Sequence, residues 1–297
     1  MLPLAVICAL CTFVNVGVVI TVDNIEAADN GETILKGNQK VLYARLSDAK
    51  FFWENDIRLI QKDGLDAWLG KLVNVTFHNK LGSQADKVTR VSALTKILAK
   101  RLSYDIVDAV KSANICKCDL ASEMVYEFPE LQGVMGRYYA ISCGYSDSVA
   151  KVCEEHYGPK GPNDPVPTAL TSVAVALADK LDTLLGFWII DEKPTSSKDP
   201  FALRRAAIGL LRIIIENKLT FKLRDLISYN IRLFQDQGVK IINEITEQQV
   251  LEFIKERMRN VLKLKNIKAD MIEASISSHA GDDFLALYVK TILMNKY

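Results

Sequence analysis

The sequence predicts a mainly α-helical protein. From Val41 onward, apolar residues recur three and four positions apart, which is the spacing of one buried face of a helix. Strand-type alternation of apolar and polar residues does not return in force over that stretch. With 297 residues, 49% hydrophobic side chains and a net charge of +1, the composition is that of an ordinary globular protein, long enough for two domains.

The first 22 residues contain no charged side chain. β-branched residues at alternate positions from Val14 to Val22 favour a buried strand at the edge of a domain. The same length of apolar sequence also suits a membrane or export segment. No Lys or Arg precedes the apolar run, so the basic region of an export signal is missing and the strand is the preferred interpretation. The stretch from Asn24 to Lys40, with its Asn30-Gly31 pair, then predicts a turn-rich connector.

The helical pattern that follows is interrupted at four places. Breaks fall near Gly82, Cys143–Ser146, Gly158–Pro167 and Glu192–Pro200. The third of these holds four of the eight prolines, which predicts a rigid surface loop rather than a flexible linker.

Residues 173–188 predict a buried helix with two aspartates beside its apolar face. Asp179 and Asp182 are three positions apart and therefore project close together. We expect this pair to meet basic partners, with one arginine of the Arg204-Arg205 pair as a candidate, or to cap a neighbouring backbone, because unpaired carboxylates are costly to bury. The alternative is a pair of acid/base carboxylates. The next helix is predicted to begin at Asp199-Pro200, with the carboxylate as a cap and the proline at the first helical position.

No glycine-rich phosphate loop, nucleophile elbow or HExxH helix is present. One spacing, that of His78, Asp119 and Asp179, resembles the all-helical HD phosphohydrolases, whose H…HD…D pattern holds a divalent metal. Cys118 stands where the second histidine belongs, and a thiol prefers softer metals than magnesium or manganese. The preferred interpretation is a helical core with degenerate ligand positions; the alternative is a metal-dependent phosphohydrolase that uses His78, Asp119 and Asp179.

The spacing of Cys116, Cys118, Cys143 and Cys153 matches no common structural zinc module. We expect buried free thiols at these positions. His156, beside the proline-rich loop, is expected to be a surface or hydrogen-bonded histidine.

Basic residues on two helices are candidates for contacts with a phosphate backbone. Glu252 and Glu256 are interleaved with the basic residues between Lys255 and Lys268, so a solvated helix with internal ion pairs is the slightly preferred interpretation there. The candidates are Arg204, Arg205, Lys255, Arg257, Arg259 and Lys263.

Five ordered runs resemble the β subunit of bacterial tetrameric glycyl-tRNA synthetase. They are GNQKVLYARLSDAKFFWENDI (37–57), KLGSQADKVTRVSAL (80–94), CDLASEMVYEFPELQGVMGRYYA (118–140), ALADKLDTLLGFW (176–188) and KPTSSKDPFALRRAAIGLLRI (193–213). The resemblance implies a cytoplasmic subunit that contributes tRNA recognition, with the α subunit and tRNA(Gly) as partners and no membrane association. It also implies that ATP, with Mg, is used on the α subunit, so that this chain binds no cofactor or metal and carries no catalytic residue.

The resemblance begins at about Thr21 and implies three segments. Residues 1–42 would be the truncated strand and connector of a preceding domain, and 43–216 a degenerate HD-like helical domain. Residues 217–297 would be a helical region leading into an incomplete anticodon-binding-type domain. Because the family's β subunit is far longer, we expect this chain to be an internal piece of such a protein.

Overall fold

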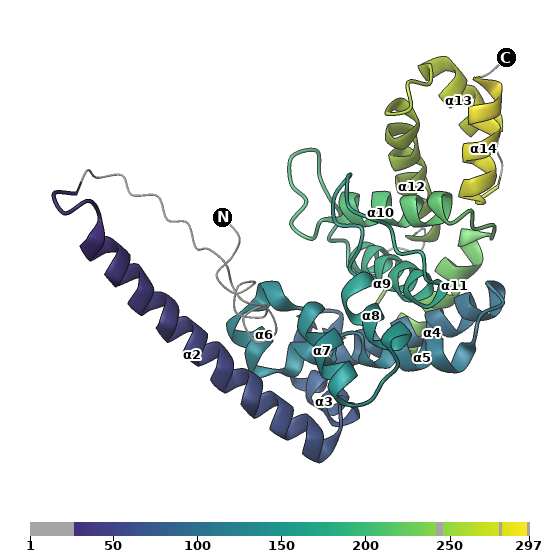
Figure 1. The fold of residues 1–297 in the computed structure, drawn as a ribbon. Helices are drawn as coiled ribbons and strands as arrows, with labels where there is room; N and C mark the ends of the chain where they lie inside the picture. The colour runs from purple at the N-terminus through teal and green to yellow at the C-terminus, as the bar shows by residue number, and fades with distance from the viewer. Residues whose placement is uncertain (1–26, 242–245, 279–280, 296–297) are drawn as a thin grey trace.

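The computed structural model describes residues 27–241, 246–278 and 281–295. Over these residues the chain is mainly helical, which confirms the predicted fold class (Figure 1). The strand predicted within residues 1–22 lies outside the described residues. The first elements are α2 (Glu32–Asp63), α3 (Asp66–Lys71), η1 (Leu72–Asn74), β1 (Thr76–His78), β2 (Gly82–Ser83), α4 (Gln84–Arg101), α5 (Ile106–Ile115) and η2 (Cys118–Ala121). They are followed by α6 (Glu123–Glu127), η3 (Pro129–Leu131), α7 (Val134–Ser142), α8 (Asp147–Glu155), α9 (Leu170–Ile189), α10 (Leu203–Glu216), α11 (Leu223–Asp236), α12 (Thr246–Lys263), α13 (Ala269–Ser278) and α14 (Phe284–Met294).

Helix α9 is the centre of the main core. Every residue from Thr171 to Ile189 except Thr183 is buried, so the helix is covered on all sides. Helices α4, α5, α8, α10, α11 and α12 pack around it. Such a helix can hold charged side chains only where its neighbours supply opposite charges.

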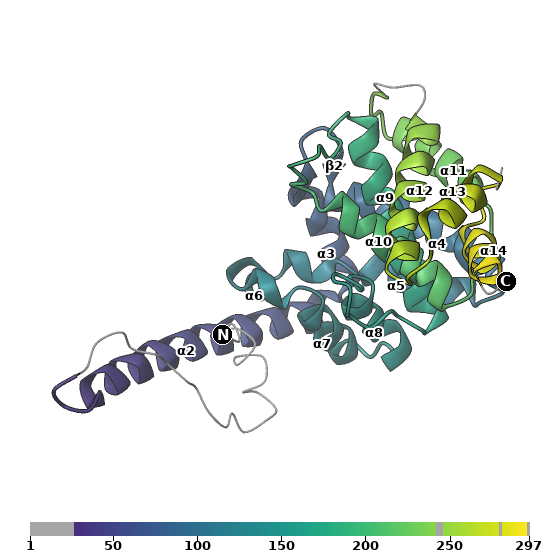
Figure 2. The same cartoon turned by 90° about the horizontal axis from the view of Figure 1, so that it is seen from above.

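A second apolar cluster forms between α2, α3, α6, α7 and α8. From α2, the buried members of this cluster are Ala49 and Ile60, in its C-terminal half. The N-terminal part of α2 extends away from the other helices in both views (Figures 1 and 2). The Asp56 carboxylate is buried in this cluster and accepts hydrogen bonds from two backbone N–H groups of α6 and from the Tyr139 hydroxyl.

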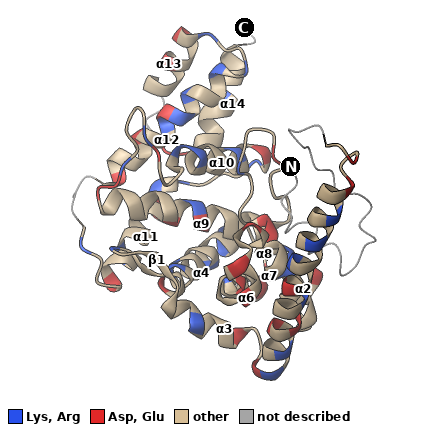
Figure 3. Ribbon diagram, turned by 90° about the vertical axis from the view of Figure 1, so that its left-hand side faces the viewer, with Lys and Arg blue, Asp and Glu red and all other residues tan. Residues whose placement is uncertain are grey.

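Helices α11 and α12 pack against α9 through the same apolar cluster that surrounds it, and α10 contacts both α12 and α14. Lys and Arg occur along α10 and α12, which lie next to each other (Figure 3). The predicted boundaries at residues 42 and 216 remain predictions. Among the helices of the described residues, none has both the length and the hydropathy that a bilayer crossing requires.

Two helix starts differ from the sequence prediction. Helix α2 begins at Glu32, inside the predicted connector, because the Asp29 carboxylate accepts hydrogen bonds from the N–H groups of Gly31 and Thr33. Helix α10 begins at Leu203 rather than at Pro200. The predicted capping carboxylate is nevertheless correct, since Asp199 accepts from the N–H groups of Leu203 at 2.8 Å and Arg204 at 3.0 Å.

Candidate functional site

A cluster of buried charges lies where α9 meets α4 and the end of α5. Arg90 donates to Asp182 through Nε at 2.8 Å and Nη2 at 3.1 Å. Lys117 Nζ lies 3.0 Å and Lys87 Nζ 3.3 Å from Oδ1 of Asp179. None of these five side chains is more than 12% exposed. Both aspartates therefore meet basic partners, as expected, but these come from α4 and the end of α5 and not from the Arg204-Arg205 pair.

The two lysines keep Asp179 ionised inside the core. Burial opposes the charged carboxylate, but the ammonium groups of Lys117 and Lys87 outweigh it and hold the pKa of Asp179 well below its usual range. Asp179 Oδ1 accepts no well-aligned hydrogen bond from any described residue. The attraction of the two nearby ammonium groups therefore holds this oxygen.

His156 completes the cluster on the side of α8. Burial, together with the Lys117 ammonium, lowers the pKa of His156 to about 3, so the ring is neutral at pH 7. Its Nε2 lies 3.0 Å from Lys117 Nζ, which can only donate, and its Nδ1 lies 2.8 Å from the carbonyl of Val152. Nε2 is thus the acceptor, and Nδ1 carries the proton donated to Val152. The ring is buried and hydrogen-bonded, one of its two expected states.

The four HD positions do not come together as ligands. His78 lies in β1, where its ring packs edge-on against Phe187 at 5.5 Å. Cys118 is buried, and burial raises the pKa of its thiol well above the usual value. Across residues 27–241, 246–278 and 281–295, no group of three or more His, Cys, Asp or Glu side chains is placed to hold a metal ion.

Asp119 is committed to the backbone of α7 instead. Its Oδ2 accepts from the N–H groups of Gly133 at 2.5 Å and Gly136 at 3.2 Å. Burial raises the pKa of Asp119 to about 6 although both of these bonds lower it. With Asp119 bound to backbone and Asp179 bound to two ammonium groups, the donor set does not fit a divalent metal, and the phosphohydrolase alternative is not supported.

Cys116, Cys118 and Cys153 are buried, and Cys143 is half-buried. All four are free thiols, as expected. Burial raises the pKa of each, so none is a thiolate at pH 7.

The basic residues of α12 are largely paired. Lys255 meets Glu252 at 2.9 Å, and Arg259 forms two bonds to Glu273 of α13 at 2.8 and 3.1 Å. Arg257 pairs with its neighbour Glu256 and lies over the Phe253 ring. Lys263 is exposed and has no ion-pair partner in the described part of the chain. The ion pairs that the sequence allowed are thus present, and a phosphate-binding role of these residues remains a prediction.

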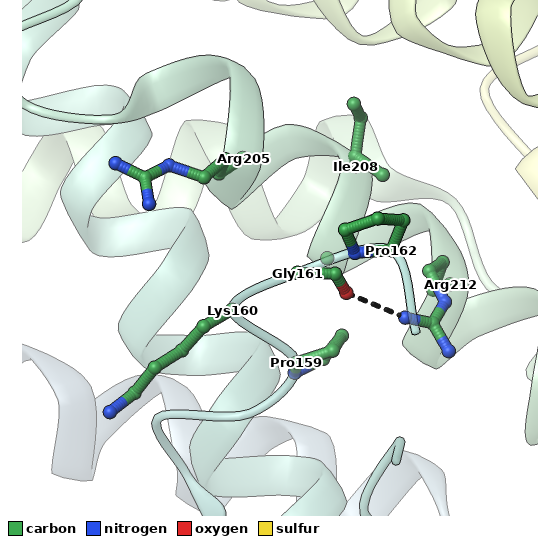
Figure 4. A pocket seen from close by; sticks show the side chains of 8 residues that line it. Pro159, Lys160, Gly161, Pro162, Arg205, Ile208 and Arg212 are labelled. Atoms are coloured by element: carbon green, nitrogen blue, oxygen red, sulfur yellow. Dashed lines mark hydrogen bonds between the residues drawn. The ribbon is translucent and has the colours of Figure 1, made fainter. Parts of the chain in front are cut away.

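The two adjacent arginines of α10 have different surroundings. Arg204 donates to the carbonyl of Thr195 and lies 4.0 Å from Asp199, so it holds the loop before α10. Arg205 is exposed and forms no ion pair with any residue that the structure describes. It borders a hollow of about 210 Å³, the α10 hollow, lined by Pro159, Lys160, Gly161, Pro162, Arg205, Ile208, Gly209 and Arg212 (Figure 4).

Sequence reasoning missed Lys87, Arg90 and Lys117 as partners of the aspartates. It also missed Lys160, which lines the same hollow as Arg205. Lys87 and Arg90 left a signal, because they are three apart on α4 and each precedes a valine of its buried face. Lys160 left none, since it reaches α10 only through the folding of its loop.

Comparisons with known proteins bear on what these features serve. The family profile described as glycyl-tRNA synthetase beta subunit matches residues 17–277. A glycine–tRNA ligase beta subunit of Ruegeria sp. (strain TM1040) is 51% identical over 272 residues, which are 91% of this chain and 38% of the relative. One from Paracoccus denitrificans (strain Pd 1222) is 49% identical over 268 residues, 90% of this chain and 37% of the relative. The chain thus spans less than two fifths of the length of these relatives.

Proposed function

Because the chain belongs to the glycyl-tRNA synthetase beta subunit family, we propose that it serves the attachment of glycine to tRNA(Gly). Its part would be to contact tRNA and the α subunit. Glycine activation, with ATP and Mg, would take place on the α subunit, and this chain would bind no cofactor or metal of its own. The assembly would act in the cytoplasm. The proposal rests on the identity of about half of the aligned residues to two glycine–tRNA ligase beta subunits, over nine tenths of this chain.

The buried charge cluster supports a non-catalytic role for the HD-like region. Asp179 corresponds to a metal-ligand position of the HD phosphohydrolases. Here it faces two ammonium groups, which repel a metal cation. A buried ion network of this kind fixes the packing of α4, α5 and α9 against one another. The region is then a scaffold whose outer surface is available for partners.

The surface offers separate candidates for RNA contact. Arg205, Lys160 and Lys263 are exposed and carry no ion pair within residues 27–241, 246–278 and 281–295. The paired Lys255, Arg257 and Arg259 would have to exchange a carboxylate for a phosphate, so we rank them below the unpaired cations.

Native mass spectrometry of the full chain mixed with the α subunit and tRNA(Gly) tests the proposal. We expect masses that correspond to the chain bound to the α subunit, and a further species that includes the tRNA. A folded chain that binds neither partner at micromolar concentration would contradict the proposal. A tRNA specific for another amino acid serves as the specificity control.

A further inference from the structure

The α10 hollow combines an apolar floor with two exposed cations. The surface that lines it is almost entirely apolar and includes Pro159, Pro162 and Ile208, and Lys160 and Arg205 border it. In Figure 4 the side chains of Lys160 and Arg205 extend toward the same side of the loop. Neither forms an ion pair with a described residue, although Lys160 Nζ lies 5.4 Å from the centre of the Tyr157 ring. The two charges are therefore available to an outside anion.

Hydrogen bonds within the chain hold the hollow in shape. Arg212 donates to the carbonyls of Gly161 at 3.0 Å and Asp164 at 2.9 Å, which fastens the loop to α10. The Asp164 carboxylate in turn accepts from the N–H groups of Lys160 at 2.9 Å and Gly161 at 2.8 Å. A site whose walls are already ordered loses little conformational entropy when a ligand binds.

Close packing of the loop on α10 fixes the floor of the hollow. A Cβ placed at Gly209 would lie 3.1 Å from the carbonyl oxygen of Pro159 and 3.0 Å from Cε of Lys180. The glycine thus permits a close approach that a larger side chain would prevent. Loop and helix together form one surface, although their residues are some fifty positions apart in the sequence.

The chemistry of the hollow matches one unpaired nucleotide. A single strand of RNA presents a charged phosphate, an apolar base face and then another phosphate, and proteins bind it with cations beside an apolar platform. At about 210 Å³ the hollow is smaller than the roughly 300 Å³ at which sites for drug-sized ligands begin, so it suits one ring rather than a complete cofactor.

We propose that the α10 hollow binds a single unpaired nucleotide of tRNA, with the base against Pro162 and Ile208 and the adjacent phosphates at Arg205 and Lys160. This assignment rests on the proposed function, since it takes tRNA as the partner. Beyond that function, it specifies the surface that contacts the tRNA and states that the bound nucleotide is unpaired.

The test uses the full chain with the α subunit and fluorescein-labelled tRNA(Gly), with binding measured by fluorescence anisotropy at several salt concentrations. The test variant is Lys160→Ala/Arg205→Ala. The matched control is Arg58→Ala/Lys62→Ala, which removes the same two charges from exposed positions on α2. Circular dichroism and thermal melts of both variants verify that the fold is retained.

Loss of two phosphate contacts is expected to weaken binding by roughly thirtyfold at 0.1 M salt and to reduce the slope of log K against log salt by about 1.4. The control is expected to change affinity less than about threefold. If the two double variants bind alike while wild type binds tRNA(Gly), the assignment is wrong and the proposed function stands. If wild type itself does not bind tRNA(Gly), both are wrong. If the test variant loses the α subunit but keeps the tRNA, the hollow is a protein contact and the assignment is again wrong.

A second measurement does not depend on affinity. The substitution Ile208→p-benzoylphenylalanine places a photoreactive group at the floor of the hollow. Irradiation of the complex is expected to give a cross-link at one nucleotide or two adjacent ones in a single-stranded part of the tRNA. Cross-links spread over paired stems, or none while the variant still binds tRNA, would contradict the assignment.

Discussion

Replacing Lys117 by methionine removes one of the two ammonium groups that hold Asp179 in the core. The side chain of Lys117 is 5% exposed and its Nζ lies 3.0 Å from the carboxylate. Breaking a buried ion pair by removing one partner costs about 3 to 5 kcal/mol, because the remaining charge stays buried. Lys87 remains 3.3 Å from the same oxygen, so we expect the lower end of that range, about 3 kcal/mol.

The assay is urea unfolding followed by circular dichroism at pH 7. Asp179 has a depressed pKa in the folded state, so its contribution to stability is present above the unfolded value of 3.8 and is lost only as the pH falls through the folded value. At pH 7 the whole contribution is therefore measured. The control Lys96→Met removes the same charge from an exposed position on α4 and should change the free energy of unfolding by no more than about 0.5 kcal/mol.

A double-mutant cycle separates the ion pair from simple loss of packing. If the charges attract, Asp179→Asn should cost less in the Lys117→Met background than in wild type, by about 1 kcal/mol or more. Lys117→Met as stable as wild type, or single effects that simply add, would refute the role given to the lysine.

The remaining predictions concern single positions between α2 and α10. Gly136→Ala places a Cβ 2.9 Å from Cβ of Cys153 and 3.1 Å from Cγ of Asp119, so it should lower the free energy of unfolding by about 1 to 3 kcal/mol. Gly37→Ala, in open space on α2, should instead raise the free energy of unfolding by about 0.5 to 1 kcal/mol. Urea unfolding of both variants distinguishes the effect of packing from that of helix propensity. His156, with its pKa lowered from 6.5 to about 3, contributes stability that is full above pH 6.5 and is lost toward pH 3, by about 1.4 kcal/mol per pH unit within that window. Asp119, with its pKa raised from 3.8 to about 6, stabilises the fold as the pH falls through that range, which opposes the effect of His156. The measurement is therefore the difference in the free energy of unfolding between wild type and His156→Gln, which should shrink as the pH falls. A difference that is constant with pH would contradict the lowered pKa of His156. Asp199→Ala should cost about 1 kcal/mol of stability through loss of the α10 cap, and thermal unfolding equal to that of wild type would show that the cap contributes nothing.

Local sequence patterns were enough to predict the helical class and the main breaks. The α9 helix could be predicted because its leucines and valines follow the helical period. Asp179 and Asp182 could be singled out because they are charged residues within an otherwise apolar stretch. The capping carboxylate of Asp199 was also readable, but the start of α10 was not. Pro200 suits a first helical position, yet the backbone passes through a left-handed residue at Ala202 before the helix begins.

Features built from distant segments could not be predicted in the same way. Lys117 and His156 are 39 positions apart, and only the packing of α8 beside α5 brings them to Asp179. The α10 hollow likewise depends on Arg212 fastening the proline-rich loop. Arg205 could be named from the sequence for its charge. That it has no ion pair within the described residues, and that it lines one hollow with Lys160, follows from the tertiary structure alone.

The most direct test of the account is aminoacylation by a chimeric β subunit. Residues 27–295 of this chain replace the matching segment of the full-length Ruegeria β subunit, and the chimera is combined with the α subunit, ATP, glycine and tRNA(Gly). We expect glycyl-tRNA to form at a rate within about tenfold of the rate with the parent β subunit. A folded chimera that assembles with the α subunit but charges no tRNA would contradict the central claim that this chain serves as part of a glycyl-tRNA synthetase.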